Sequence, residues 1–399
     1  MTFKSIFMTG LLSAAFAMPA LAQEADGSDL QIDPVADFRL RYEAVDQSGA
    51  ASSADALTAR ARLGVSASKN GWQILVEGEG TLALIDDYND TIPSNGIEPF
   101  PVVADPDSIE LNRVSAGYMQ DGNGVTVGRQ RIIHGNARFV GNVGWRQNEQ
   151  TFDAVRAQAA LGPVSLDASY SVSQRTIFGS ESPNSHFDGE FILLNASANL
   201  KIVDLTTFGY IVDYDKRLAF SSQTFGVTAK AILPVTGLSP SITLGFATQS
   251  DTGGNPLNYS ANWYHAELGA DIAGFTLAAG YEELGSDGGF AAFQTPLATL
   301  HAFNGWADIF LVTPANGLRD YYARVGRGIG IPGLGNVKAA LAYHQFDSDF
   351  GGLDYGTEWD ASLGFKIGRV GLLAKYADYN ASGFAVDTEK FWLQAQISF

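Results

Sequence analysis

Four arginines occupy alternate positions in two short segments near the start of the chain, Arg39 and Arg41 in the first and Arg60 and Arg62 in the second. Residues two apart in an extended strand point to the same face, so each pair projects to one side. Guanidinium groups stay charged and bind carboxylates or phosphates through paired N–H donors. Two such strands side by side would present a cationic ladder that attracts anions. The alternative is structural, because the same groups can pair with carboxylates and brace a wall.

Further charged residues fall on the polar faces of later segments. The positive ones are Arg113, Arg156 and Lys338, and the negative ones are Glu77, Glu79 and Asp153. An arginine that faces lipid at the middle of a bilayer costs about 2–4 kcal/mol. We therefore expect all of these side chains to face a watery lumen and to line a pathway for solutes.

Two arginines and one tryptophan need separate treatment. The alternation set by Val125 and Val127 turns Arg129 and Arg131 outward, unless a bulge or a position beyond the membrane edge intervenes. Trp392 points inward by the same reasoning and is a candidate for stacking on a sugar ring.

The elements that position these residues are two-faced strands. From residue 35 onward the chain reads as alternating segments of about 10 to 14 residues, the pattern of a membrane β-barrel. In the last segment Phe391, Leu393, Ala395, Ile397 and Phe399 alternate with mostly polar residues. The sequence predicts an all-β fold, a transmembrane antiparallel β-barrel of about 18 strands within a range of roughly 16 to 20.

The connections between the predicted strands alternate between short and long. Lys69-Asn70-Gly71 is a tight hairpin turn, whereas segments 83–108, 133–149 and 285–317 are long. Short periplasmic turns on one rim and long extracellular loops on the other produce this alternation. A barrel of this size leaves an aqueous channel, which loops 133–149 and 285–317 would narrow if they fold inward.

Both ends of the chain fit an exported barrel. Residues 1–22 have the charged, apolar and small-residue parts of a secretory signal peptide. Residues 23–399 would then form a single barrel domain in the bacterial outer membrane, in contact with its lipid and lipopolysaccharide. We expect the last strand to pair with the strand that begins near Val35, and Phe399 to contact the barrel-assembly machinery.

Composition argues against several other functions. The formal net charge of −18 argues against a nucleic acid partner. The absence of cysteine excludes disulfides, thiolate metal sites and cysteine nucleophiles. There is no G-x-S-x-G or H-E-x-x-H and the five histidines are scattered, so we expect no enzyme, no metal site and no cofactor. The acid-rich segment 86–107 lacks the spacing of a calcium loop, so we expect a solvated surface loop there.

Three groups of motifs resemble the alginate-export family of outer-membrane barrels. They are Phe38-Arg39-Leu40-Arg41-Tyr42-Glu43 with Thr58-Ala59-Arg60-Ala61-Arg62-Leu63-Gly64, the stretch 127–156, and the stretch 293–320. The resemblance implies an 18-stranded barrel with an arginine-rich lumen, partly closed by a long extracellular loop and by a periplasmic turn. It also implies outward passage of an anionic polysaccharide. Loops 133–149 and 285–317 carry family-like motifs, and the residues that we expect to anchor them are Trp145, Arg146, Trp306 and Asp308.

The function that these features favour is a porin-like channel for anionic or polar solutes, including acidic oligosaccharides, with an arginine-lined lumen. One alternative is a dedicated exporter of an alginate-like exopolysaccharide. A second is a structural or adhesive surface barrel whose long acidic loops make the contacts. The direction of transport and the choice between monomer and trimer stay open at this point.

Overall fold

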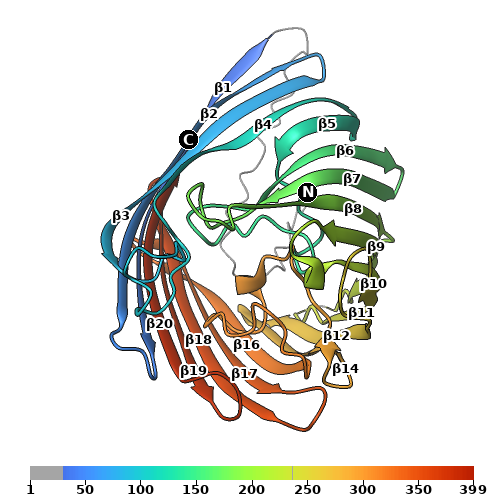
Figure 1. The fold of residues 1–399 in the computed structure, drawn as a ribbon. Helices are drawn as coiled ribbons and strands as arrows, with labels where there is room; N and C mark the ends of the chain where they lie inside the picture. The colour runs from blue at the N-terminus through green and yellow to red at the C-terminus, as the bar shows by residue number, and fades with distance from the viewer. Residues whose placement is uncertain (1–29, 236) are drawn as a thin grey trace.

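The structure, a computed structural model, describes residues 30–235 and 237–399, so the expected signal peptide at 1–22 lies outside the described residues. In the described part of the chain, 18 strands form one closed antiparallel sheet, as expected (Figure 1). The strands of the barrel are β1 (Gln31–Gln47), β2 (Ala54–Lys69), β3 (Trp72–Asp87), β4 (Ser108–Gln120), β5 (Asn123–Gln130), β6 (Thr151–Leu161), β7 (Val164–Arg175), β8 (His186–Asn199), β9 (Val203–Tyr214), β10 (Ser222–Ile232), β11 (Ser241–Asp251), β12 (Ser260–Ile272), β13 (Phe275–Leu284), β16 (Leu318–Ile331), β17 (Gly335–Asp347), β18 (Asp354–Ile367), β19 (Val370–Ala381) and β20 (Thr388–Ser398). Their loops contain the short elements η1 (Leu218–Phe220), β14 (Ser286–Asp287), β15 (Ala291–Ala292) and η2 (Leu300–Ala302).

The barrel closes between its first and last strands. β1 pairs with β20 from Asp37 opposite Ser398 to Gln47 opposite Thr388, and it pairs with β2 on its other side. The backbone N–H of Phe399 donates to the carbonyl oxygen of Ala36 at 2.8 Å. The sheet therefore has no free edge at the point of closure, and the expected pairing of the two ends is confirmed.

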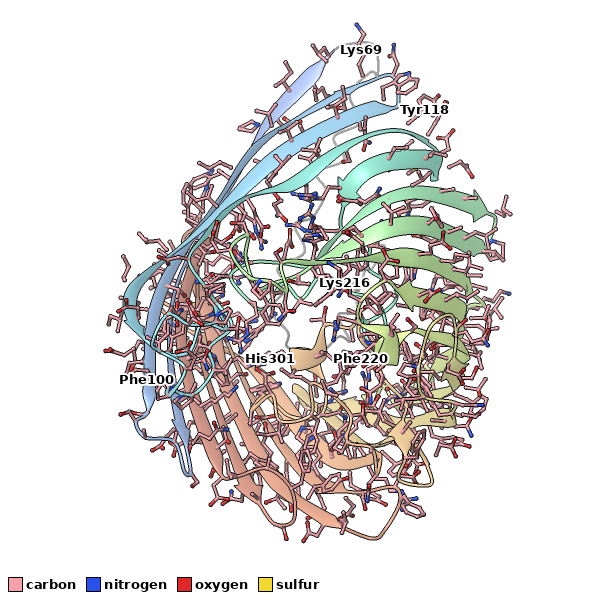
Figure 2. The ribbon with its side chains drawn as sticks, viewed as in Figure 1. Lys69, Phe100, Tyr118, Lys216, Phe220 and His301 are labelled. Carbon is pink, nitrogen blue, oxygen red and sulfur yellow. The ribbon has the colours of Figure 1, made fainter. Side chains whose placement is uncertain are left out.

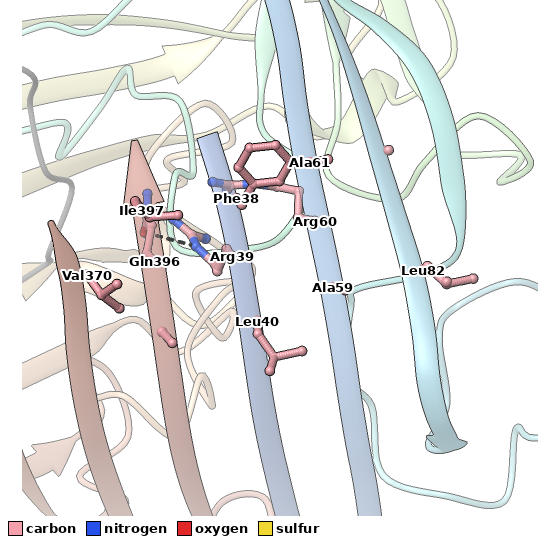
Figure 3. A pocket seen from close by; sticks show the side chains of 12 residues that line it. Phe38, Arg39, Leu40, Ala59, Arg60, Ala61, Leu82, Val370, Gln396 and Ile397 are labelled. Atoms are coloured by element: carbon pink, nitrogen blue, oxygen red, sulfur yellow. Dashed lines mark hydrogen bonds between the residues drawn. The ribbon is translucent and has the colours of Figure 1, made fainter. Parts of the chain in front are cut away.

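Alternation along each strand separates an apolar outer face from a polar inner one. In β1, Phe38 and Leu40 are 41% and 45% exposed, whereas Arg39 and Arg41 are 5% and 1% exposed. A shallow hollow on the outer face, lined by side chains such as Leu40, Leu82 and Ile397, has the same apolar character (Figure 3). Such a face suits lipid rather than water.

The connections alternate as the sequence predicts. On one rim the turns have two or three residues, apart from 233–240, and on the other rim the loops are longer. Asn70 and Gly71 both have positive φ, 50° and 82°, which a two-residue turn of this hand requires. Among the residues described, no helix is long and apolar enough to cross a membrane.

A band of aromatic side chains marks the outer face near the long-loop rim. Neighbouring strands bring Tyr281 to 5.0 Å from Tyr321 and Tyr343 to 4.8 Å from Trp359, between ring centroids. At the opposite rim Trp72 lies 5.3 Å from Tyr118. Aromatic rings at both ends of the apolar face are typical of the two membrane interfaces.

Three long loops fold into the barrel and pack together. Residues 131–150 meet residues 285–317 where the N–H of Gly141 donates to the carbonyl oxygen of Leu297 at 2.9 Å. Val140 and Phe293 are fully buried in this contact region. Figure 2 shows His301, from the second loop, inside the outline of the barrel. We refer to the inward parts of loops 131–150 and 285–317 together as the plug.

The third inward loop corrects one expectation. The acid-rich segment was expected to be solvated throughout, but Tyr88, Val103 and Asp105 are buried to 1%, 0% and 0% exposure. The hydroxyl of Tyr88 donates to the carbonyl oxygen of Asp105 at 2.8 Å. Only the part around 93–98 is largely exposed, so this loop both reaches solvent and packs against the wall.

Candidate functional site

The four arginines of the predicted ladder do share one patch of the inner wall. Arg39 lies directly opposite Arg60, and Asp37 lies opposite Arg62, between β1 and β2. The ladder is covered, however, because Arg39 donates to the carbonyl oxygens of Gly144, Trp145 and Arg146 at 3.2, 3.0 and 3.0 Å. Figure 3 shows the further hydrogen bond from Arg39 to Gln396 on β20.

The other three arginines of the ladder are also engaged. Arg60 forms an ion pair with Asp37, and Arg62 forms one with Glu79. Arg62 also donates to the carbonyl oxygen of Gln147 at 3.2 Å. The Cζ atom of Arg41 lies 3.9 Å from the centroid of the Trp145 ring. The main chain of the plug therefore occupies the positions that an anionic solute would take on the ladder.

Arg146 joins the plug to two other parts of the molecule. Its guanidinium lies 2.9 Å from Glu43 of β1, 3.0 Å from Asp308 of the second plug loop and 3.7 Å from Asp105. Burial alone would lower the pKa of Arg146, but these three carboxylates outweigh burial and raise it. The contribution of Asp105 was not anticipated, and the apolar residues Tyr88 and Val103, which precede it in the same loop, were the available signal for its burial.

A cluster of tryptophans surrounds Lys375 at the base of the plug. The Nζ atom of Lys375 lies 3.7 Å from the ring centroid of Trp306, 4.2 Å from Trp145 and 5.5 Å from Trp392. Its fourth neighbour is Nε2 of His301, at 2.6 Å. Trp392 is fully buried in this cluster, so its ring has no face open to a sugar in this state. The four expected loop anchors, Trp145, Arg146, Trp306 and Asp308, all lie in or beside it.

His301 links the two plug loops to the wall. Its ring stacks on Trp145 with centroids 4.4 Å apart, and Nδ1 lies 2.8 Å from the carboxylate of Asp308. These neighbours fix the tautomer, because Nδ1–H donates to Asp308 and Nε2 accepts from Lys375. Burial lowers the pKa of His301 to about 3, against the opposing effect of Asp308 and together with Lys375 and Arg146.

The lowered pKa of His301 predicts that its contribution to the free energy of unfolding is lost in mild acid. Below about pH 6.5 the unfolded chain binds a proton at His301 that the folded chain does not, so the contribution of His301 to stability falls by about 1.4 kcal/mol per pH unit until about pH 3. Burial alone would raise the pKa of Asp308, but His301 and Lys390 outweigh burial and hold it well below its usual range. Asp308 therefore adds nothing to this slope above about pH 4.

Urea unfolding at pH 7 and pH 5 measures the effect. His301→Gln should show a smaller drop in stability between the two pH values than the unchanged protein does. His186→Gln, at an exposed position, is the control and should keep the original drop. Equal drops in all three proteins would contradict the assignment.

A second charged patch covers the inner wall from β3 to β6. Arg113 pairs with Glu77 at 2.6 Å, and Arg131 pairs with Glu149 at 2.5 Å. Burial alone would raise the pKa of Glu149, but Arg131 and Arg62 outweigh burial and lower it. Arg131 points inward because the strand ends at Gln130 and the chain turns into the lumen. Here Arg113 and Arg131 keep 18% and 29% of their side-chain surface exposed.

Arg156 and Asp153, three positions apart on β6, lie on opposite faces. Arg156 pairs with Asp167 on the inner face and is 17% exposed. Asp153 instead pairs with Arg129 at 2.7 Å, on the face of β5 that carries the exposed Val125 and Val127. The expected place of Asp153 in the lumen is therefore wrong. The residue points outward near the long-loop rim, where it meets Arg129.

The opposite wall carries a smaller set of charges. Arg324 of β16 pairs with Glu267 of β12 and is 35% exposed. Glu267 also accepts from the hydroxyl of Tyr322 at 2.8 Å, and that hydroxyl lies 3.0 Å from Nε2 of His265. Lys338 of β17 is exposed on the face that also carries the inward His344. The lumen therefore has basic groups on two facing walls.

Next to the plug, the wall formed by β8 to β12 is largely aromatic, which sequence reasoning missed. Phe191 and Leu193 are fully buried on its inner face. Phe139 of the plug packs on this wall, with its ring centroid 4.6 Å from Phe208 and 5.0 Å from Trp263. The unbroken apolar run Phe191-Ile192-Leu193-Leu194 was the available signal, because such runs are typical of strands covered on both faces.

No group of three His, Asp or Glu side chains in residues 30–235 and 237–399 has the arrangement of a metal site. The arrangement instead suits the binding and steering of anions, with basic groups at the wall and two loops that reduce the open cross-section.

The sequence profile of the alginate export family matches residues 32–268, more than half of the chain. The chain belongs to the alginate export family. The match covers both ladder strands, the first plug loop and the aromatic wall. No curated protein matches this member of the family.

Solved structures share the fold at low sequence identity. OpdK from Pseudomonas aeruginosa, solved with vanillate, has a TM-score of 0.72 at 14% identity, over 92% of this chain and 98% of that one. OccK2 (OpdF) from the same organism, solved with glucuronate, has a TM-score of 0.68 at 14% identity, with the same coverage. OccK9 (OpdG) has a TM-score of 0.70 at 15% identity, over 92% of this chain and 99% of that one. This member of the alginate export family thus has the fold of outer-membrane porins.

Proposed function

We propose that this protein is a channel of the bacterial outer membrane that passes small anionic solutes, with carboxylated sugars and their short oligomers as the main class. The observation that carries the proposal is the set of basic side chains that stay partly open on facing walls, Arg113, Arg131, Arg156, Arg324 and Lys338. The vanillate and glucuronate in two structures of the same fold are both small carboxylates, which supports this class of solute.

The covered ladder changes which residues set the selectivity. The four arginines of the ladder are 6% exposed or less, so the plug separates them from an ion that passes through the lumen. Partly open groups act on it directly. We therefore assign three basic residues to the solute pathway, Arg113, Arg156 and Lys338. Glu77 and Glu79 hold Arg113 and Arg62 in place through ion pairs.

The test is the reversal potential of the refolded protein in a planar bilayer under a salt gradient. The double variant Arg156→Ser, Lys338→Ser should reduce the preference for chloride over potassium by about twofold or more, because two positive charges leave the wall and Asp167 loses its partner. Lys69→Ser is the matched control, since Lys69 lies at the end of β2 next to a short turn and outside the lumen. An unchanged reversal potential in the double variant would reject the proposed pathway.

Export of an alginate-like polymer is the second candidate. It is favoured by the family and by the continuous row of arginines under the plug, which would become a track for uronate units if the plug moved. The same recordings separate the two functions. Block by glucuronate in the unchanged protein supports the small-solute channel, whereas a silent barrel that conducts only after the plug is removed supports export.

A further inference from the structure

The loop between β9 and β10, residues 215–221, brings two adjacent cations to the extracellular mouth. Lys216 is exposed and Arg217 is half-buried, and η1 follows directly. In Figure 2 Lys216 and Phe220 lie within the outline of the barrel. Phe220 packs against the same apolar cluster that holds the plug, so this loop is attached to the inner side of the wall.

The guanidinium of Arg217 lies between aromatic rings. Its Cζ atom is 4.4 Å from the ring centroid of Phe187, 4.3 Å from Phe220 and 5.6 Å from Tyr214. The wall fixes these rings, because Phe187 belongs to β8 and the buried Tyr214 donates its hydroxyl to Gln174 at 2.7 Å. Arginine stacks on aromatic faces in this way while its N–H groups point outward in the plane of the guanidinium.

Within the described residues, Arg217 differs from the other inward arginines because no carboxylate pairs with it. Burial lowers its pKa, and Tyr214 is the one group that opposes this effect. By contrast, the arginines with a carboxylate or carbonyl partner include Arg39, Arg60, Arg62, Arg113, Arg146 and Arg156. Arg217 is thus a guanidinium with its faces covered and its donors unused, at the entrance to the lumen.

We propose that Arg217 captures the carboxylate of a small organic acid at the extracellular mouth. A carboxylate in the plane of the guanidinium can accept two parallel N–H hydrogen bonds, and partial burial strengthens such a pair. The adjacent Phe187 and Phe220 offer apolar edges to the ring of the solute. Lys216 offsets the charge of the exposed Asp215 beside it. The proposal deepens the proposed channel function by assigning it an entry site.

The test is equilibrium binding of D-glucuronate to the folded barrel in detergent, which does not depend on conduction. Arg217→Gln should weaken binding by about tenfold or more, because it removes a charged bidentate partner. Arg217→Lys should keep part of the affinity, since lysine retains the charge but not the planar pair of donors. Lys216→Gln is the matched control and should change the affinity by less than about twofold, because an exposed charge contributes little. Neutral D-glucuronamide should bind weakly to all four proteins.

Three results would overturn the capture site: equal glucuronate affinity in Arg217→Gln and the unchanged protein, equal binding of glucuronate and glucuronamide, or no glucuronate binding at millimolar concentration. Failure of the channel is a separate result. A barrel that never conducts but loses glucuronate affinity in Arg217→Gln keeps the capture site and rejects the channel. A barrel that conducts with anion selectivity but shows no effect of Arg217→Gln keeps the channel and rejects the capture site.

Discussion

Replacing residues 137–148 by a short Gly-Ser linker should raise the single-channel conductance by about twofold or more. This segment occupies the lumen, where its carbonyl oxygens accept from Arg39 and Arg62 and where Gln147 donates to Thr58 of β2 at 2.8 Å. An 18-stranded barrel without it is a wide aqueous channel. The replacement also uncovers Arg39 and Arg62, so the preference for anions should increase together with the conductance.

The control replaces residues 92–98 of the third inward loop, a largely exposed stretch, by the same Gly-Ser linker. This variant should leave the conductance unchanged. Trp145→Ala is the milder variant, because it removes the ring between Arg41 and His301 without shortening the chain. Retained heat-modifiable migration on a gel shows that each barrel has folded. Unchanged conductance in both the replacement and Trp145→Ala, with folded barrels, would mean that the plug does not limit the current.

Asp308→Ala should lower the free energy of unfolding by about 3–5 kcal/mol, because it leaves the buried Lys390 without its carboxylate partner and removes one of the three carboxylates around Arg146. Asp308 lies 2.8 Å from His301, 3.0 Å from Arg146 and 3.5 Å from Lys390, so one carboxylate serves both plug loops and β20. Urea titration of the folded barrel measures the decrease in the free energy of unfolding. A small change at Asp308 should therefore loosen the contacts of the second plug loop with Arg146 and with β20.

The comparison variant is Asp188→Ala, which removes a carboxylate beside His186 near the long-loop rim, where the two side chains are 58% and 43% exposed. Exposed pairs contribute about 0–1 kcal/mol, so this variant should stay close to the unchanged protein. Similar losses of unfolding free energy in the two variants would show that burial of the ion pairs around Asp308 adds nothing to stability. Noisy openings in bilayer recordings of Asp308→Ala, absent in Asp188→Ala, would connect the lost stability to the plug.

The barrel itself could be predicted because alternation is local. Phe391 and Trp392 fall on opposite faces by position alone, and the hairpin at Asn70 and Gly71 is encoded by its two residues. Asp153 was placed wrongly although alternation holds there, because it lies three positions from the inward Arg156 and an odd separation puts two residues on opposite faces of a strand.

The closed state of the site could not be predicted for a different reason. The partners of Arg39 are main-chain carbonyls of residues 144–146, and a carbonyl carries no signature in the sequence. Lys375 and His301 are 74 positions apart and meet only because a loop crosses the lumen. Residue types indicated which groups could bind anions, but only the path of the loops determined which of them stay open.

The tryptophan cluster also bears on how the molecule is assembled. Trp145 comes from the first half of the chain, Trp306 from the second, and Lys375 and Trp392 from the last two strands. Trp392 lies on β20, the strand that closes the barrel against β1, so the cluster is incomplete without that strand. One strand thus serves both the closure of the wall and the anchoring of the plug, so completion of the barrel and completion of the contacts around Lys375 depend on the same segment of the chain.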